Sequence, residues 1–469
     1  MSMQGGIFIM QTNNINVLMS DNDDGYVFGS GIEKSEIIKI VFSNTVENIP
    51  NTAWDVSWDD SPIDSIMAWV DKKVLYVYSN GRIFANPNCN SFFRNYINVQ
   101  EIDFGNCFDT SLTTNMKWMF ARCKNLKTLN LSTFDTSHVT DMRGMFYGCE
   151  HLTTLNLSPL NTSHVTDMKW MFCLCKNLKS LNLHDLQTNH VTDMGGMFTD
   201  CQSLITLDLS SLDTSNTTDM SHMFENCKSL QTLILENLNT SQVTDMSHMF
   251  QNCEQLTQLN LKGINTSKVT DMSKMFKNCV SIENLDISSL NTAKVTTMNE
   301  MFGFCKNLKT LNVSTLQTAK VTNMNIMFAG CKNLKSLNLQ NFNTSKVTDM
   351  SGMFYSCENL KDLNVSNLNT SKVTDMRWMF KGCEQLETLH LENFNTSKVN
   401  NTSEMFRDCK NLVTIKMNME KFNTGRVTNM SQMFRNCKKL RGIDIRQFNT
   451  AKVNDMSEIL AGCENLSLQ

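Results

Sequence analysis

The stretch that decides the fold runs from Ser137 to Leu157 and reads Ser-His-Val-Thr-Asp-Met-Arg-Gly-Met-Phe-Tyr-Gly-Cys-Glu-His-Leu-Thr-Thr-Leu-Asn-Leu. Close copies of it recur from about residue 99 to the end of the chain. Its cysteine sets the period: the repeat cysteines from Cys123 to Cys409 are 26 residues apart, and two more follow after 28 and 26 residues. A fixed period of about 20 to 50 residues predicts a solenoid, in which each repeat forms one rung.

Each repeat has two halves with different hydrophobic periods. Residues 152–157 read Leu-x-x-Leu-x-Leu, which predicts a short strand and matches the leucine-rich-repeat pattern. Residues 139–149 carry apolar side chains at near-helical spacing, which predicts one or two helical turns, capped by Thr140 or Asp141. The expected fold is therefore a leucine-rich-repeat-like solenoid of about fourteen rungs, with one parallel β-sheet and short helical turns on the opposite side.

The repeats suggest three parts of the chain: an N-terminal extension at 1–29, a small capping β region at 30–92 and the solenoid at 93–469. Within the cap we expect four strands, with a hairpin turn at Ser79-Asn-Gly between the last two; they span 37–42, 66–70, 74–78 and 82–85. The array is expected to begin near residue 92 and to end inside a strand, so self-association through an open C-terminal rung is one expectation. A frayed last rung is the simpler alternative.

Composition sets further bounds. The chain has 469 residues, a formal net charge of -4, 33 methionines and 17 cysteines. Most methionines fall at repeat positions that we expect in the core, where methionine fills gaps. Cysteines at one inward position per rung suit disulfide geometry poorly, so we predict free thiols and a reducing or anaerobic setting. Residues 1–18 lack the basic and apolar regions of a signal peptide, and no stretch approaches the length of a membrane span.

The repeat Phe342-Asn-Thr-Ser-Lys-Val-Thr-Asp-Met-Ser-Gly-Met-Phe-Tyr-Ser-Cys-Glu-Asn-Leu-Lys-Asp-Leu-Asn-Val365 closely resembles the repeats of BspA-type leucine-rich-repeat surface proteins of bacteria. The stretch from Ala53 to Asn86 also resembles the segment that precedes those repeats. Members of that family are mostly secreted or attached to the cell wall, and some bind host matrix proteins or other bacteria. The resemblance implies a recognition role, whereas the missing signal peptide departs from the family pattern.

Two polar columns are candidate binding surfaces. Between the inward leucines of the strands, a column that includes Asn130, Asn156 and Asn182 faces outward, and it is flanked by columns of mostly threonine and serine that include Thr128. It predicts either side-chain ladders that satisfy one another across rungs or a hydrogen-bonding surface for a repetitive ligand. A second column consists of the residue that precedes the repeat valine.

That second column begins with histidines and continues as a basic stripe that includes Lys268, Lys294 and Lys320. A basic stripe favours acidic glycans or nucleic acid, but an acid or amide three residues on in many rungs favours a solvated, partly paired ladder, so nucleic acid is not expected. The histidines at 138, 164 and 190 offer a weak metal signal without a grouped carboxylate. We therefore predict no metal site and no cofactor.

Three tryptophans share one repeat position: Trp118, Trp170 and Trp378. A neighbouring rung carries glycine at that position in each case, so each indole either lies flat over a glycine or anchors a partner. The sequence holds no catalytic motif, and repeated columns do not converge on one pocket as catalytic groups do. We expect a non-enzymatic recognition or adhesion protein that binds a protein or polysaccharide, at the cell surface by family resemblance. The alternative is an intracellular, cytoplasmic interaction scaffold.

Overall fold

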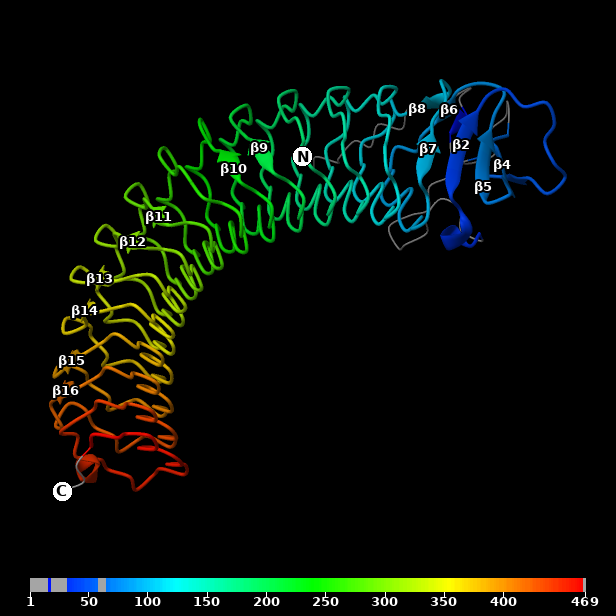
Figure 1. Cartoon of the computed structure of the whole chain (residues 1–469). Helices are drawn as coiled ribbons and strands as arrows, with labels where there is room; N and C mark the ends of the chain where they lie inside the picture. Colours follow the sequence, from blue (N-terminus) through cyan, green and yellow to red (C-terminus); the bar gives the residue numbers. More distant parts are fainter. Residues whose placement is uncertain (1–15, 18–31, 58–64, 467–469) are drawn as a thin grey trace, which may run out of the picture.

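The structure is a computed structural model, and it describes residues 16–17, 32–57 and 65–466. The chain forms a curved arch of stacked rungs, with a small β region at its N-terminal end (Figure 1). The arch is the solenoid that the 26-residue period predicts. The predicted extension at 1–29 lies outside the described residues, except for β1 (Asn16–Val17). Among the residues that the structure describes, no helix has the length and apolarity to cross a bilayer.

The N-terminal region continues the solenoid rather than forming a separate body. Its five-stranded sheet has the order β3-β4-β5-β2-β7, and β2 lies parallel between β5 and β7, the first strand of the repeats. A second sheet has the order β1-β6-β8, all parallel. The bounds are η1 (Lys34–Glu36), β2 (Lys39–Ser43), β3 (Trp54–Asp55), β4 (Met67–Asp71), β5 (Val74–Tyr78), β6 (Ile83–Phe84), β7 (Glu101–Asp103) and β8 (Phe108–Asp109).

The four strands expected in the cap are present within one or two residues of the predicted bounds, but the predicted hairpin is wrong. β5 pairs antiparallel with β4, through a tight turn at Lys72 and Lys73, both of which have positive φ. β6 instead pairs in parallel with β8, which lies in the next rung. The turn at 79–81 therefore carries the chain from one sheet to the other instead of folding β6 back onto β5.

The strands of the repeats pair two by two. β9 pairs with β10, β11 with β12, β13 with β14 and β15 with β16, each in parallel and in register. The single parallel sheet expected from the sequence is thus divided in the described residues. The bounds are β9 (Thr206–Asp208), β10 (Thr232–Ile234), β11 (Asn284–Leu285), β12 (Thr310–Leu311), β13 (Ser336–Asn338), β14 (Asp362–Asn364), β15 (Thr388–Leu391) and β16 (Thr414–Met417), followed by η2 (Ile445–Gln447).

The other half of each rung is a run of tight turns rather than helical turns. Its backbone N–H groups alternate between two kinds of partner. Phe146 donates to Met171 O of the next rung at 2.9 Å, whereas Tyr147 donates to Gly144 O of its own rung at 2.9 Å. An α-helix would send every one of these N–H groups to the fourth residue back. The prediction of short helical turns is therefore wrong, because the neighbouring rung takes half of the donors.

This difference between the two sides accounts for the arch. On the turn side a ladder of single parallel bridges links Asn88 to Asn115 and continues without a break to Asp455. On the strand side the paired strands are interrupted, although single backbone bonds such as that from Gln231 N–H to Ile205 O, 2.9 Å, still join consecutive rungs. Figure 1 accordingly shows β9 to β16 toward the outer, convex edge of the arch, whereas its inner edge consists of tight turns.

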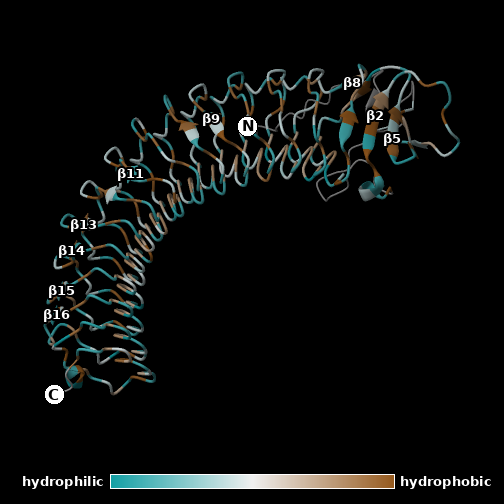
Figure 2. Cartoon of the chain, viewed as in Figure 1, coloured by the Kyte–Doolittle hydropathy of each residue, from teal (hydrophilic) through white to brown (hydrophobic). Residues whose placement is uncertain are grey.

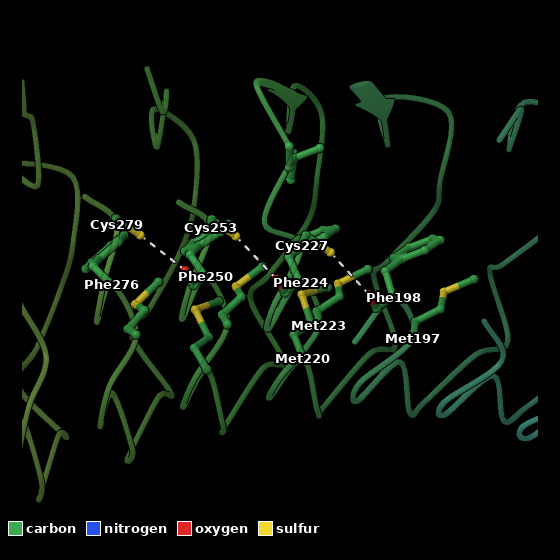
Figure 3. Close-up of a cluster of buried hydrophobic side chains, with 14 of the residues drawn as sticks. Met197, Phe198, Met220, Met223, Phe224, Cys227, Phe250, Cys253, Phe276 and Cys279 are labelled. Atoms are coloured by element: carbon green, nitrogen blue, oxygen red, sulfur yellow. Dashed lines mark hydrogen bonds between the residues drawn. The ribbon is translucent and has the colours of Figure 1, made fainter. Parts of the chain in front are cut away.

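The core is a set of columns, one side chain per rung. Phenylalanine rings from Phe93 to Phe434 stack in an unbroken row, with centroids 5.3–5.9 Å apart and planes within 13° of parallel. Buried methionines and cysteines lie beside them (Figure 3). Figure 2 shows hydrophobic and hydrophilic segments recurring around each rung along the whole arch. The array is stabilised by contacts between adjacent rungs, as the repeat predicts.

Candidate functional site

The turn side presents a column of side chains that we call the turn column. Each member lies five residues after the repeat valine position and has a left-handed φ between 54° and 61°. Non-glycine residues adopt this conformation at a cost of about 1–2 kcal/mol, so the stacked rungs must hold it in place. From the first tryptophan onward the column comprises Trp118, Gly144, Trp170, Gly196, His222, His248, Lys274, Glu300, Ile326, Gly352, Trp378, Glu404, Gln432 and Glu458.

Trp118 and Trp170 meet across the glycine that separates them. Their rings lie 5.9 Å apart, with 30° between the planes. A Cβ placed on Gly144 would lie 2.0 Å from Cζ3 of Trp118, so the indole occupies the space that a side chain would need. Trp170 in turn covers Gly196. The expectation that an indole lies over a neighbouring glycine is therefore met at both positions.

Packing over glycine does not bury Trp170, which is 37% exposed. The two indoles form the floor of a depression of about 410 Å³, and Tyr147 stands edge-on to Trp118 at 5.3 Å. Neither indole N–H has a hydrogen-bond partner among the described residues. We call this group the aromatic site and define it by Arg94, Trp118, Arg122, Tyr147 and Trp170.

Positive charge surrounds the aromatic site. The Arg94 guanidinium lies 5.9 Å from the Trp118 ring, and Lys169 Nζ lies 5.3 Å from the Trp170 ring. Nε of Arg94 is buried and has no hydrogen-bond partner in the described part of the chain. Burial lowers the pKa of Lys169, but its contacts with Asp193 and Asp219, each 3.1 Å, outweigh this and raise it, so that lysine stays charged. An aromatic floor with cationic walls suits a planar or acidic group of a partner.

Trp378 has a different environment from the other two tryptophans. Its indole N–H donates to Glu404 Oε1 at 3.0 Å, in the following rung, and Arg377 lies over its ring at 5.0 Å. Gly352, in the preceding rung, is covered by Ile326 instead. Side chains of this column lean toward the C-terminal neighbour, so the pairing expected between Trp378 and Gly352 does not form. Trp378 is satisfied within the chain.

Further along the turn column, a group that the sequence analysis missed comes together. Nδ1 of His222 lies 2.6 Å from Oε2 of Glu225, and Nδ1 of His248 lies 3.8 Å from Oε1 of the same carboxylate. The two imidazole rings stack at 4.2 Å. Burial raises the pKa of Glu225, but the hydrogen bond with His222 and the nearby imidazole of His248 outweigh burial and lower the pKa to about 2. The spacing H-x-x-E followed by histidine one period later was the available signal.

The polar column on the strand side does not form cross-rung ladders through its asparagines. The side-chain oxygens of Asn130, Asn156 and Asn182 each accept the backbone N–H two residues on in their own rung, at 3.0–3.1 Å. These asparagines and Thr128 are exposed. The asparagine side chains therefore stabilise the turn after the strand instead of forming the expected ladder. A role of these residues in binding stays a prediction.

The basic stripe is exposed and has fewer partners than the sequence suggests. Lys268 donates to Gln242 Oε1, and no ion pair with an acid is found for Lys268, Lys294 or Lys320 among the described residues. The acids expected to pair with them are used elsewhere: Asp271, for example, accepts the backbone N–H of Ser273 at 2.7 Å. The histidines at 138, 164 and 190 are also exposed, and the metal-ligand geometry lies in the turn column instead.

The fold is a repeat solenoid (Figure 1). The chain belongs to the family described as "Mycoplasma protein of unknown function, DUF285", whose model matches residues 87–206, 202–311, 296–413 and 387–469. No curated protein matches the chain.

Solved structures similar to the chain include three repeat proteins. A leucine-rich repeat protein from Eubacterium ventriosum is 17% identical, with 76% of this chain and 86% of that chain covered and a TM-score of 0.37. The TLR13–ssRNA13 complex is 16% identical, with 83% and 73% covered and a TM-score of 0.19. The functional domain of InlJ from Listeria monocytogenes, which includes a cysteine ladder, is 16% identical, with 65% and 57% covered and a TM-score of 0.16. At these TM-scores the family match alone carries the assignment.

Proposed function

We propose that this protein is a non-enzymatic recognition protein that binds a partner through the turn-side surface of the solenoid, with the aromatic site as its anchor. The observation that carries the proposal is the pair Trp118 and Trp170. Their rings stack on each other, Trp170 is 37% exposed, and neither indole N–H is bonded within the described residues. Exposed tryptophan, tyrosine and arginine are the residue types that dominate binding energy at protein interfaces.

This composition supports a protein partner ahead of a glycan. Arg94 and Arg122 flank the indoles, and guanidinium groups recognise carboxylates through paired hydrogen bonds. Many rungs with similar columns, such as the one that includes Lys294 and Lys320, would add weak contacts in parallel, which raises avidity toward an extended partner. The resemblance to BspA-type surface proteins favours adhesion to a matrix protein or cell surface; an intracellular scaffold is the second candidate.

A binding screen with matched variants tests the anchor. The full chain is applied to immobilised matrix glycoproteins and to a glycan array, beside a Trp118→Ala/Trp170→Ala variant and a Trp378→Ala control. We expect the double variant to bind at least tenfold more weakly, and the control to bind like the wild type, because Trp378 is bonded to Glu404. Wild-type affinity in the double variant would overturn the proposal. Binding confined to glycans would assign the site to sugars.

Location separates adhesion from scaffolding. Intact source cells are treated briefly with protease, and released peptides are identified by mass spectrometry beside a cytosolic control protein. Release of repeat peptides without the control supports surface display. If repeat peptides are recovered only after lysis, adhesion is the wrong role for this chain and the scaffold is the better description.

A further inference from the structure

Two histidines of the turn column and one glutamate beside them form a group of potential metal ligands outside the aromatic site. His222, Glu225 and His248 each offer one donor atom, and these atoms lie within 4.8 Å of one another. His222 and His248 occupy the same repeat position one period apart, so stacking of the rungs is enough to bring the two imidazoles together. Glu225 lies on the turn that follows His222 and reaches both rings.

The contacts within the group leave donors unused. Nδ1 of His248 is buried and has no hydrogen-bond partner in the described part of the chain, since Glu225 Oε1 at 3.8 Å is beyond hydrogen-bond reach. Oε1 of Gln251 is likewise buried without a partner there, although its Nε2 donates to Glu225 Oε1 at 2.7 Å. A buried imidazole nitrogen 3.8 Å from a carboxylate oxygen, with no hydrogen bond between them, is an arrangement that a cation between them would satisfy.

Other carboxylates on this surface, at the repeat position of His222 and His248, have lysine as ion-pair partner. Glu300 is paired with Lys277 at 2.5 Å, and Glu404 is paired with Lys381 at 2.6 Å. The ion pairs that the structure gives Glu225 are both with histidine. Histidine can act as a neutral metal ligand, whereas lysine at this position could only form an ion pair.

From these observations we propose that His222, Glu225 and His248 bind a divalent transition-metal ion of the zinc class. Two imidazole nitrogens and one carboxylate oxygen are a ligand set for such ions, which leaves one coordination position for water or a partner group. Ligands about 2.0–2.1 Å from a tetrahedral ion lie roughly 3.3 Å apart. The 3.8 Å contact of His248 therefore closes slightly on binding, and the 2.6 Å contact of His222 opens.

The chain also provides an outer layer for this site. Gln251 holds Glu225 through its amide, and Oγ1 of Thr199 donates to the backbone carbonyl of His222 at 2.7 Å, which fixes the turn that carries the imidazole. Groups that orient the ligands typically contribute a factor of about 10 to 100 in metal affinity. The bound ion would cross-link two consecutive rungs on the turn side.

The test is a Co²⁺ titration of the full chain after treatment with a chelator, read by visible absorption. We expect one equivalent per chain with a tetrahedral or five-coordinate spectrum, loss of at least tenfold in affinity in Glu225→Gln and His248→Ala, and a smaller loss in Gln251→Ala. His138→Ala is the matched control and should bind as the wild type does, because that histidine is exposed and outside the group. Glu225→Gln keeps the size of the side chain, so it separates ligand loss from misfolding.

Three outcomes would overturn the proposal. In the first, the wild type binds no Co²⁺ up to millimolar concentration. In the second, Glu225→Gln and His248→Ala have the circular dichroism spectrum of the wild type and bind Co²⁺ as well as it does. In the third, the spectrum shows thiolate-to-cobalt charge transfer, which would place the ion on cysteine. A parallel thermal scan adds an independent readout: Zn²⁺ should raise the melting temperature of the wild type and of His138→Ala, but not of Glu225→Gln.

Discussion

The thiol of Cys253 donates a hydrogen bond to the carbonyl oxygen of Phe224 in the preceding rung, with 3.2 Å between sulfur and oxygen (Figure 3). The same oxygen accepts the backbone N–H of Cys227 at 3.1 Å, so it serves its own rung and the next one. The arrangement recurs from Cys123 to Cys463. Cysteine thus fills a small buried space and also satisfies a carbonyl lone pair, which alanine or valine would leave unbonded.

The first prediction concerns this bond. Cys253→Ala should lower the free energy of unfolding by about 1–2 kcal/mol, because it removes a buried sulfur and leaves part of a carbonyl unsatisfied. Cys463→Ala is the matched control: that thiol makes the same bond to Phe434 but is only partly buried, so its loss should cost less. Urea denaturation of each variant measures the difference. Equal losses at the two positions would show that burial of the thiol contributes nothing.

The second prediction concerns thiol reactivity. All seventeen cysteines are free, and sixteen of them are buried. Burial raises the pKa of Cys305 and Cys357 to about 12, so in the native chain these thiols stay protonated and out of reach of a reagent at pH 8. We expect a native thiol titration to count about one reactive group, assigned to Cys463 by peptide mapping, and a denatured titration to count all seventeen. A denatured count well below seventeen would reveal disulfides or modified thiols.

The third prediction is a loss of stability in alkali. A thiol whose pKa is higher in the folded chain than in the unfolded chain contributes stability that is complete below the unfolded value, near 8.5, and is lost as the pH rises toward the folded value. For Cys305 and Cys357 that window runs from about pH 8.5 to about 12. Each such thiol should cost about 1.4 kcal/mol per pH unit within it.

Denaturation curves at pH 8 and pH 10 measure this slope. A Cys305→Ala/Cys357→Ala variant is less stable at pH 8 but should lose less on going to pH 10, because two titrating thiols are gone. If the variant and the wild type lose stability equally over this range, the buried cysteines are not the cause and the alkaline transition belongs to other groups.

The sequence predicts the periodic features of this structure well and the non-local ones poorly. The 26-residue spacing puts equivalent residues of stacked rungs in one column. Because the columns of Phe146, Met145 and Cys149 are apolar, the sequence is enough to place them in the core. The same residues have near-helical spacing, but a run this short is marginal as a helix on its own. Whether Phe146 N–H bonds within its rung or to Met171 of the next rung is decided by the neighbouring rung, which local periodicity cannot reveal.

In the candidate sites too, the sequence predicts the periodic features but not the contacts between rungs. The glycine beside each tryptophan is visible in the sequence, but the direction of lean is not, so the pairing is met for Trp118 with Gly144 and absent for Trp378 with Gly352. His222 and His248 are also visibly one period apart. Their importance depends on Glu225, which belongs to a different column and is brought to them by the left-handed turn after His222.

The fourth prediction tests how Gly144 supports the aromatic site. Gly144→Ala places a Cβ 2.0 Å from the Trp118 ring, so the indole must swing away from Trp170. Gly148→Ala is the control: it has a similar positive φ, but its Cβ would lie 3.6 Å from Arg122, an ordinary contact. Both variants should lose about 1 kcal/mol from the left-handed backbone, and Gly144→Ala should lose about 1–3 kcal/mol more from the clash.

Stability and tryptophan fluorescence together read out this change. Fluorescence should shift in Gly144→Ala and stay unchanged in Gly148→Ala. Adding Trp118→Ala to Gly144→Ala removes the clashing ring, so the extra loss should disappear in the double variant. An extra loss that persists without the Trp118 ring would mean that Gly144 is required by the backbone alone.

The fifth prediction concerns the aspartate or asparagine that forms the turn-side bridge in most rungs, and asks whether Asp245 acts through a side-chain oxygen or through its charge. Oδ1 of Asp245 accepts the backbone N–H of Ser247 at 2.8 Å, and Asn323, Asn401 and Asn429 make the equivalent bond in other rungs at 2.8–2.9 Å. The bond therefore needs a side-chain oxygen but no charge. Asp245→Asn should leave stability within about 0.5 kcal/mol of the wild type, whereas Asp245→Ala should lose about 1 kcal/mol, as when a capping side chain is removed.

The neighbours of Asp245 indicate that Asp245→Asn should raise the stability rather than lower it. It bridges to Asp219 and Asp271 in the adjacent rungs, and no ion pair with lysine or arginine is found for it in the described residues. Since stacked like charges repel, Asp245→Asn should gain stability most clearly at low salt, and the gain should shrink as salt screens the repulsion. Urea denaturation at low and high ionic strength measures both effects. Equal destabilisation by asparagine and alanine would show that the carboxylate acts through its charge and that the turn bond is dispensable.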